Sequence, residues 1–251
     1  MTLLRATWLL FGRSLRHILR SPDTIITVVL MPIAFLLLFV YVFGGAIQTG
    51  SDIKYVNYLL PGILLIAVAS GISYTAYRLF MDVQKGMFTR LHSMPLPRSA
   101  GLWGHVLTSL VSNAISLAVI IAVALLMGFR SSAGVLNWLA VAGILLLFTL
   151  ALTWLAVIPG LTAKSIDGAS AFSYPLIFLP FLSSAFVPTA TMPLVVRKFA
   201  EYQPVTSIVD ALRALVQCQP VGHGIWIALA WCVGIAAVAY FFAMRAYRRV
   251  V

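Results

Sequence analysis

The chain has 251 residues, of which 62% are hydrophobic and only 9% are charged. Because a soluble domain carries about 25% charged residues, this composition excludes a free-standing soluble enzyme and indicates an integral membrane protein. The net charge of +11 would suggest nucleic acid binding in a soluble protein, whereas in a membrane protein an excess of Lys and Arg first indicates loops that stay in the cytoplasm.

Residues 3–20 are predicted to form a basic amphipathic helix that lies in the membrane interface. Their apolar residues recur with a period near 3.6, while Arg13, Arg16 and Arg20 fall mostly on the other side. Such an elbow helix either only anchors the chain or also contacts a cytoplasmic partner. The periodicity leaves both readings open.

The rest of the chain is predicted to be an all-α polytopic membrane protein. A membrane crossing takes about 20 mostly apolar residues, and six stretches meet this requirement. The predicted spans are residues 24–45, 56–78, 101–128, 135–159, 169–188 and 223–244. Within the second span, Pro61-Gly62 is the position where a bend is most expected.

The basic residues divide unequally between the two sides of these spans. Assigning the connections alternately places 12 of the 17 Lys and Arg residues on the side of both termini and 5 on the other side. Because positively charged loops stay inside, both termini are predicted to be cytoplasmic. Topology then explains the charge, and no nucleic acid partner is expected.

The connection after the second span is predicted to contain a short amphipathic helix over residues 80–97. Phe80 and Met87 lie on its apolar face, Lys85 lies on its polar face, and the Met94–Pro97 turn stops it. A plain solvated loop would need neither the apolar stripe nor the Pro-X-Pro stop. The helix therefore either lies on lipid or docks into a groove of a partner protein.

Polar side chains recur at three-and-four spacing in the third span and near the cytoplasmic end of the second span. Such stripes must face other helices or water, so they either hold helices together or line a transport path. The small size of Ser109, Ser112 and Ser116 favours packing, whereas for the larger side chains the two readings stand level. The candidate path residues are Ser73, Tyr74, Tyr77, Asn113 and Ser116.

Residues 189–222 are not predicted to span, because prolines and charged residues interrupt them. Pro204–Val216 is predicted to be a helix on the outer side, too short to cross and therefore re-entrant or lid-like. A surface helix outside the bilayer would have the same pattern. Ser207 and Asp210 have the spacing of a capping box, and Asp210 is expected to pair with Arg213.

Several chemistries have no signature in the sequence. There is no G-x-x-x-x-G-K-[ST] loop, so this chain is not expected to bind ATP itself. No His or Cys cluster has zinc spacing, and neither a metal site nor a catalytic residue is predicted. No pair of acidic residues lies within a span, which disfavours a proton- or sodium-driven carrier.

The most specific motif is DVQKGMFTRL at 82–91, followed by SMPLPRS at 93–99. Further motifs are LRSPDT at 19–24, Met31-Pro32, FGGAI at 43–47, YLLPG at 58–62, QPVT at 203–206 and VDALRAL at 209–215. On these residues the sequence resembles the ABC-2 type transporter permeases, in particular the DrrB-like group linked to daunorubicin and doxorubicin resistance. The resemblance covers essentially the whole chain. Gln203 stands where Asn is more usual, which leaves the cap chemistry of that turn open.

The resemblance implies a permease subunit in the inner membrane of a bacterial cell, with six spans, an elbow helix, a coupling helix at 80–97 and short outer helices. It implies a second permease chain, as a homodimer or with a sister chain, and two copies of a separate ABC ATPase that binds ATP and Mg. This chain would hold no cofactor. By position, the ATPase contact would involve Gln84, Lys85, Gly86, Met87, Phe88, Arg90, Met94, Pro95, Leu96 and Pro97.

We therefore expect an ATP-driven export permease for an amphipathic drug, lipid or natural product. The outer-helix residues of interest are Pro204, Asp210 and Arg213. A second hypothesis is export of a polysaccharide or lipid-linked glycan, which the mostly small polar side chains of the spans disfavour. A third is an ATP-independent carrier or a membrane-embedded enzyme.

Overall fold

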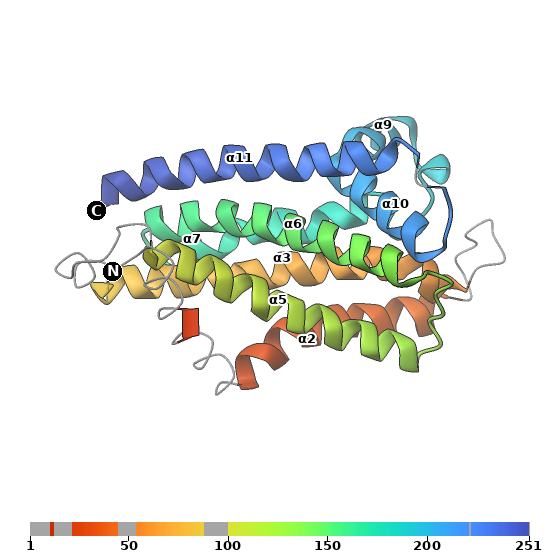
Figure 1. The fold of residues 1–251 in the computed structure, drawn as a ribbon, viewed down its shortest axis with the longest axis horizontal. Helices are drawn as coiled ribbons and strands as arrows, with labels where there is room; N and C mark the ends of the chain where they lie inside the picture. Colours follow the sequence, from red (N-terminus) through yellow and green to blue (C-terminus); the bar gives the residue numbers. More distant parts are fainter. Residues whose placement is uncertain (1–10, 13–21, 45–53, 88–99, 221, 251) are drawn as a thin grey trace.

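The computed structural model describes residues 11–12, 22–44, 54–87, 100–220 and 222–250, and these residues form helices and no strand. The long helices run side by side along the longest axis of the molecule, and their connections lie at its two ends (Figure 1). The predicted all-α class is confirmed. The predicted elbow helix lies outside the described residues except for Phe11 and Gly12, which are helical.

Four helices in the described part of the chain are long and apolar enough to cross a membrane. They correspond to the second, third, fourth and sixth predicted spans and mostly extend a little beyond the predicted bounds. Their bounds are Tyr55–Gln84 for α3, Ala100–Leu126 for α5, Val135–Thr162 for α6 and Gly224–Val250 for α11.

The first predicted span is helical but irregular. Helix α2, Pro22–Leu37, continues directly into a π-helix over Leu38–Phe43. Pro22 begins the helix, where its missing N–H leaves no bond unmade, and Pro32 lies inside it. One side of this segment, including Leu30 and Tyr41, is exposed, whereas Val29 and Leu36 are buried in the core.

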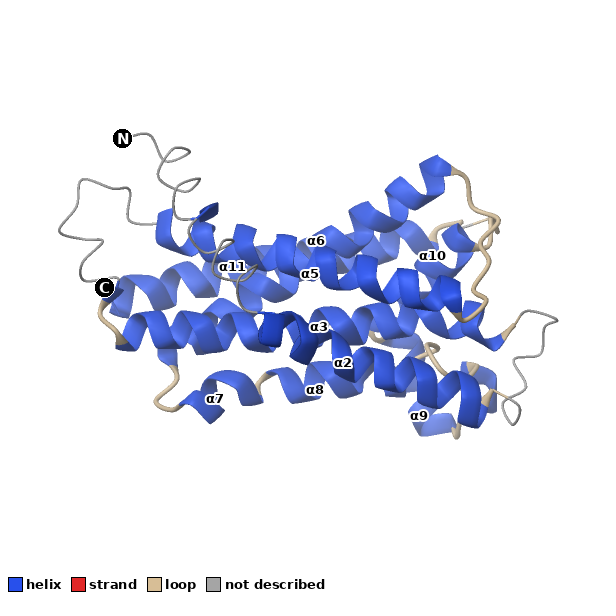
Figure 2. Cartoon of the chain, turned by 90° about the horizontal axis from the view of Figure 1, so that it is seen from below, coloured by secondary structure: helices blue, strands red, loops and turns tan. Residues whose placement is uncertain are grey.

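The region of the fifth predicted span, 169–188, is helical up to Leu182 but interrupted, and its crossing of the membrane stays a prediction. The structure divides this region into α7 (Ile166–Ala171), α8 (Ser173–Phe178) and a 3₁₀ turn at Leu179–Leu182. Pro175 and Pro180 lie in the last two pieces, and because proline has no N–H each removes a helix hydrogen bond. The pieces lie along α3 (Figure 2). The number of six spans stays a prediction.

The segment after α8 forms a 3₁₀ turn at Thr189–Thr191, helix α9 (Leu194–Tyr202) and helix α10 (Pro204–Val216). They lie together beside the start of α11, at one end of the bundle (Figure 1). The predicted bounds of α10 are confirmed. The predicted capping box is wrong, because Pro204 already begins the helix and Gln203 takes the cap position without a side-chain cap bond. Instead, Gln203 Nε2 donates to the Leu182 carbonyl at 2.5 Å.

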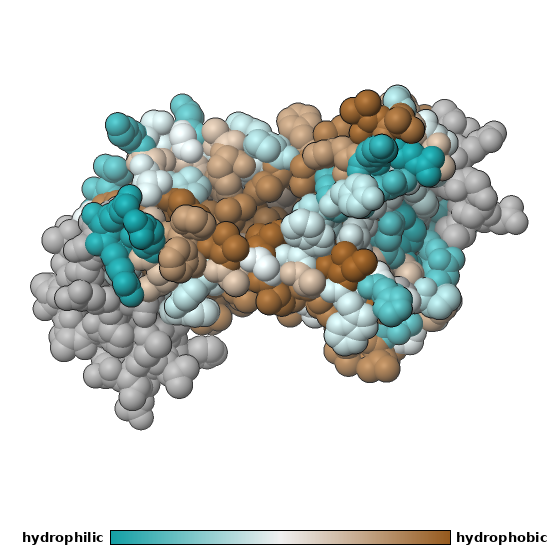
Figure 3. All heavy atoms as spheres, turned by 90° about the horizontal axis from the view of Figure 1, so that it is seen from above, coloured by the Kyte–Doolittle hydropathy of each residue, from teal (hydrophilic) through white to brown (hydrophobic). Residues whose placement is uncertain are grey.

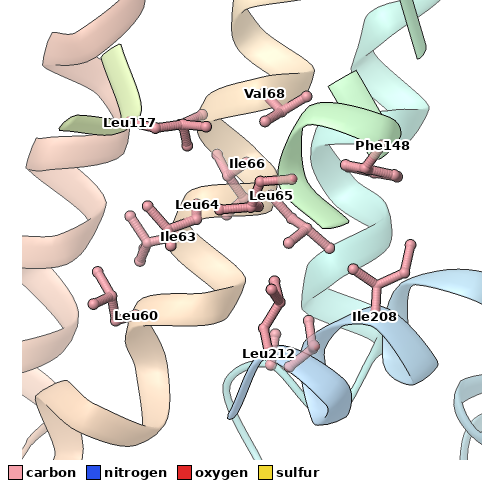
Figure 4. Close-up of a cluster of buried hydrophobic side chains, with 14 of the residues drawn as sticks. Leu60, Ile63, Leu64, Leu65, Ile66, Val68, Leu117, Phe148, Ile208 and Leu212 are labelled. Carbon is pink, nitrogen blue, oxygen red and sulfur yellow. The ribbon is translucent and has the colours of Figure 1, made fainter. Parts of the chain in front are cut away.

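Helix α3 is the centre of the bundle and is buried on nearly every side. A helix that is apolar all round needs such a position. Figure 4 shows its side chains meeting residues from three other helices, with Leu117 from α5, Phe148 from α6, and Ile208 and Leu212 from α10. Because α10 contributes to this core, it is packed onto the bundle and does not stand away from it.

The face of the molecule drawn in Figure 3 has an apolar middle and polar ends. Large apolar side chains of α11, among them Val238, Phe241 and Phe242, are exposed. A water-soluble protein rarely exposes a continuous apolar belt. The belt has the character of a surface that faces the hydrocarbon core of a membrane.

Candidate coupling end and transport path

The helix predicted over residues 80–97 begins differently from the prediction. Residues 80–84 belong to α3, which runs on to Gln84 because no Gly or Pro follows Arg78 until Gly86. The turn that ends α3 comes at Lys85–Gly86. There Gly86 has φ +66°, a left-handed conformation that glycine adopts without a steric penalty.

The contact residues carried over from the family are only partly described. Gln84 and Lys85 are exposed, and Gly86 and Met87 are half-buried. They therefore lie together at the surface where α3 ends. The candidates outside the described residues are Phe88, Arg90, Met94, Pro95, Leu96 and Pro97, together with Arg13, Arg16 and Arg20 of the elbow segment.

A close contact between an imidazole and a carboxylate joins the two helices that flank the coupling segment. Asp82, in the last turn of α3, has its Oδ2 3.1 Å from Nε2 of His105, near the start of α5. The His105 side chain is only 5% exposed, and its Nδ1 has no hydrogen-bond partner among the described residues. This contact thus fixes the end of α3 to the start of α5, the two helices that the coupling segment connects.

The aromatic candidates for the path lie on the last turns of α3. The rings of Tyr74 and Tyr77 are 5.8 Å apart, and the Arg78 guanidinium lies 5.2 Å from the centre of the Tyr74 ring. These residues and Ser73 are half-buried. They therefore form a partly open aromatic and basic surface close to the coupling end.

The remaining two path candidates lie within the bundle. Asn113 and Ser116 are each 2% exposed. A Cβ atom on Gly71 would lie 2.2 Å from Asn113 Oδ1, so the amide fills the space that a glycine leaves between α3 and α5. The structure therefore does not bring the five path candidates together on one open surface.

Three hydroxyl side chains connect α3, α5 and α6 in the bundle interior. The Thr75 hydroxyl donates to Ser109 Oγ at 2.8 Å, and the hydroxyls of Ser109 and Thr153 share a hydrogen bond of 3.2 Å. All three residues are buried. Ser109 thus holds three helices together, as the packing interpretation of the polar stripe expects.

Replacement of Ser109 by alanine is expected to cost only about 1 kcal/mol. The reason is that the Thr75 hydroxyl can donate to the Gly71 carbonyl instead, and Thr153 keeps its bond to the Thr149 carbonyl. Thermal unfolding in detergent measures this effect, with Ser112→Ala as a half-buried control on the same helix. A variant that keeps its stability but loses transport would place Ser109 on the path instead.

Polar contacts also fix α10 to α3 at the other end of the bundle, through Tyr58, Ser184, Asp210 and Arg213, which we name the outer cluster. The predicted ion pair is confirmed, since Arg213 Nη1 lies 2.8 Å from Asp210 Oδ1. The Arg213 guanidinium also lies 3.8 Å from the centre of the Tyr58 ring. These contacts hold α10 on the N-terminal end of α3.

Within the outer cluster, Ser184 comes from the segment that follows the 3₁₀ turn at Leu179–Leu182. Its hydroxyl donates to Asp210 Oδ1 at 2.6 Å. Its carbonyl accepts from Arg213 Nη2 at 2.8 Å and from the Tyr58 hydroxyl at 2.9 Å. The outer cluster therefore joins three chain segments that are far apart in the sequence.

Comparison with known proteins identifies the family. Residues 5–216 match the family model for ABC-2 type transporters. The chain is 32% identical to the daunorubicin resistance ABC transporter permease protein DrrB1 of Streptomyces coeruleorubidus, over 98% of this chain and 87% of that protein. It is 25% identical to the probable doxorubicin resistance ABC transporter permease protein DrrC of Mycobacterium tuberculosis, over 97% of this chain and 88% of that protein. The predicted resemblance is confirmed, and the chain belongs to the ABC-2 type transporter family.

Proposed function

We propose that this chain is the transmembrane permease subunit of an ABC export system that moves an amphipathic drug, lipid or natural product out of the cell. The family match over residues 5–216 carries this proposal, and the names of the two relatives refer to drug resistance. Helices long and apolar enough to cross a membrane, and a sequence without a phosphate-binding loop, fit a permease whose energy comes from another subunit.

The assembly contains two copies of a separate ABC ATPase, which bind ATP and Mg, and a second copy of this chain. Both termini lie in the cytoplasm of a bacterial cell, and the chain lies in its inner membrane. The unequal distribution of Lys and Arg supports this orientation. The coupling residues of 84–97 and the basic C-terminal end of α11 then lie on the same side as the ATPase.

The continuity of α3 supports a direct route for the coupling. A contact at Lys85 or Gly86 acts on the end of a helix that is buried along most of its length, and the Asp82–His105 pair passes any movement to α5. Close-packed elements shift between discrete arrangements rather than deforming continuously. Nucleotide-dependent movement of the ATPase would therefore tilt α3 and α5 together, away from the other helices of the bundle.

The far end of α3 carries Tyr58 of the outer cluster. The same helix thus connects the coupling end with the lid-like α10, and a tilt of α3 would strain the contacts of Arg213. Cargo would first meet Tyr74 and Tyr77, which are half-buried. Asn113 and Ser116, which are buried, would join the path only when the movement of α3 and α5 against the other helices exposes them.

Replacement of Gly86 by valine tests the coupling. At φ +66° a side chain is strained by about 1–3 kcal/mol, but nothing lies within 4 Å that it would strike. We expect the variant to fold, with co-purification of the ATPase and ATP-dependent transport lowered about tenfold.

Met87→Ala is a second variant at the same surface, and Gly134→Val is the matched control. Gly134 also has open space around it but lies before α6, away from the coupling segment. Unchanged ATPase co-purification and transport in both the Gly86 and Met87 variants would remove the proposed contact.

A further inference from the structure

A groove of about 340 Å³ lies at the C-terminal end of α11. It is lined by Phe241, Met244, Arg245, Arg248 and Arg249. Positions that repeat every three or four residues share one face of a helix, so the groove follows a single face of α11. Nothing in the proposed transport cycle uses this face.

The opposite face of α11 is occupied. Ala243, Ala246 and Tyr247 are buried in a cluster with Leu79 and Trp154, among others, from other helices. The helix cannot rotate to bury its arginines without giving up that packing. The groove therefore faces away from the other helices of the bundle. In agreement with this, the Phe241 side chain is 63% exposed.

The three arginines make no ion pair within the part of the chain that the structure describes. No acidic residue follows Asp210 in the sequence, and within the described residues no ion pair involves Arg245, Arg248 or Arg249. A guanidinium presents a planar fork of donors that binds the oxygens of a phosphate two at a time. The charge of the groove thus complements a phosphate group.

The order of the lining residues indicates more than a free anion. Phe241 and Met244 come first, nearer the middle of the molecule, and the arginines follow toward the end of the helix. The face drawn in Figure 3 likewise changes from an apolar middle to polar ends. The general excess of Lys and Arg on the cytoplasmic side of membrane proteins explains basic residues at this end of the helix. It does not explain a groove in which apolar side chains lie next to them. An acyl chain below a phosphate has this same order.

We propose that the groove binds an anionic phospholipid, with its phosphate on Arg245 and Arg248 and the upper part of an acyl chain on Phe241 and Met244. Arg249 adds charge at the rim. With the orientation proposed above, this lipid comes from the inner leaflet of the membrane.

Lipid retention by the full-length chain tests this site. The chain is purified in detergent and titrated with phosphatidylglycerol or phosphatidylcholine, and bound lipid is counted by native mass spectrometry. We expect preferential retention of phosphatidylglycerol, and about thirtyfold weaker retention by the Arg245→Gln/Arg248→Gln variant, because each lost cation near the lipid contributes appreciably. Arg197→Gln, at an exposed arginine of α9, is the matched control and should retain the lipid as the parent chain does.

The Arg245→Lys/Arg248→Lys variant covers the case in which the glutamine variant fails to insert. It keeps the charge that orients the helix but not the two-point contact with phosphate, and we expect retention below that of the parent chain. Equal retention of the two lipids would overturn the proposal, and so would retention unchanged in the variants that fold. Displacement of phosphatidylglycerol by millimolar inorganic phosphate would indicate a site for free anions and would also overturn the proposal of a lipid site.

Discussion

Replacement of Gly62 by alanine is expected to lower the stability of the chain by about 2–3 kcal/mol, the cost of an overpacked core. The added Cβ would lie 2.5 Å from Cβ of Ala185 and 3.4 Å from its Cα. Both residues are buried, so neither α3 nor the segment around Ala185 has room to withdraw. Thermal unfolding in detergent should show a midpoint lower by about 5–10 °C.

Two further variants test whether this loss comes from the contact itself. The pair Gly62→Ala/Ala185→Gly moves the methyl group from one partner to the other and should recover most of the lost stability. Gly143→Ala adds a methyl group to α6 at a position with nothing within 4 Å, and it should be neutral or slightly stabilising. Equal midpoints for Gly62→Ala and Gly143→Ala would contradict the close approach of α3 to Ala185.

Replacement of Arg213 by alanine is expected to lower the free energy of unfolding by about 3 kcal/mol. It removes a cation–π contact and leaves polar groups between packed segments of the chain without their donor. The Arg213 side chain is 13% exposed. Its loss also releases the link between α10 and the carbonyl of Ser184. The expected readouts are a lower unfolding midpoint and faster hydrogen exchange of the α10 amides, while α11 is unchanged.

The controls for this variant use the same residue type and the same position. Arg197→Ala breaks an exposed pair with Glu201 on α9, and such pairs contribute about 0.3–0.5 kcal/mol. Arg213→Lys keeps the charge but not the forked contact with Asp210 and Ser184, and its stability should fall between the parent chain and the alanine variant. If Arg213→Ala is no less stable than Arg197→Ala, the outer cluster does not hold α10.

Features encoded by local sequence were predicted well. Helix α10 has the predicted bounds because Pro204 fits only the first turn of a helix and the apolar residues after it keep one period. Asp210 and Arg213 are three residues apart on that helix, so their pairing follows from helix geometry. The bounds of the fifth predicted span came from hydropathy, which does not register that Pro175 and Pro180 lack an N–H. In the structure the helix is interrupted at Phe172 and becomes a 3₁₀ turn at Leu179–Leu182.

Features that depend on packing were missed. Tyr58 and Ser184 join Arg213 only after the chain folds, and no spacing in the sequence relates them. The same holds for Asp82 and His105. Pro61-Gly62 lies inside α3, and no pattern in the sequence indicated that Gly62 provides space for Ala185. An apolar composition predicts that the helices pack together, but it does not predict which residues contact each other.

Transport by inside-out vesicles tests the central claim most directly. Vesicles are prepared from cells that express this chain alone, its cognate ABC ATPase alone, or both, and uptake of an amphipathic fluorescent drug such as doxorubicin is followed with and without MgATP. We predict uptake only when both proteins and MgATP are present. Uptake or turnover by the chain alone, without the ATPase, would contradict a permease driven by a separate subunit and would favour a carrier or a membrane-embedded enzyme.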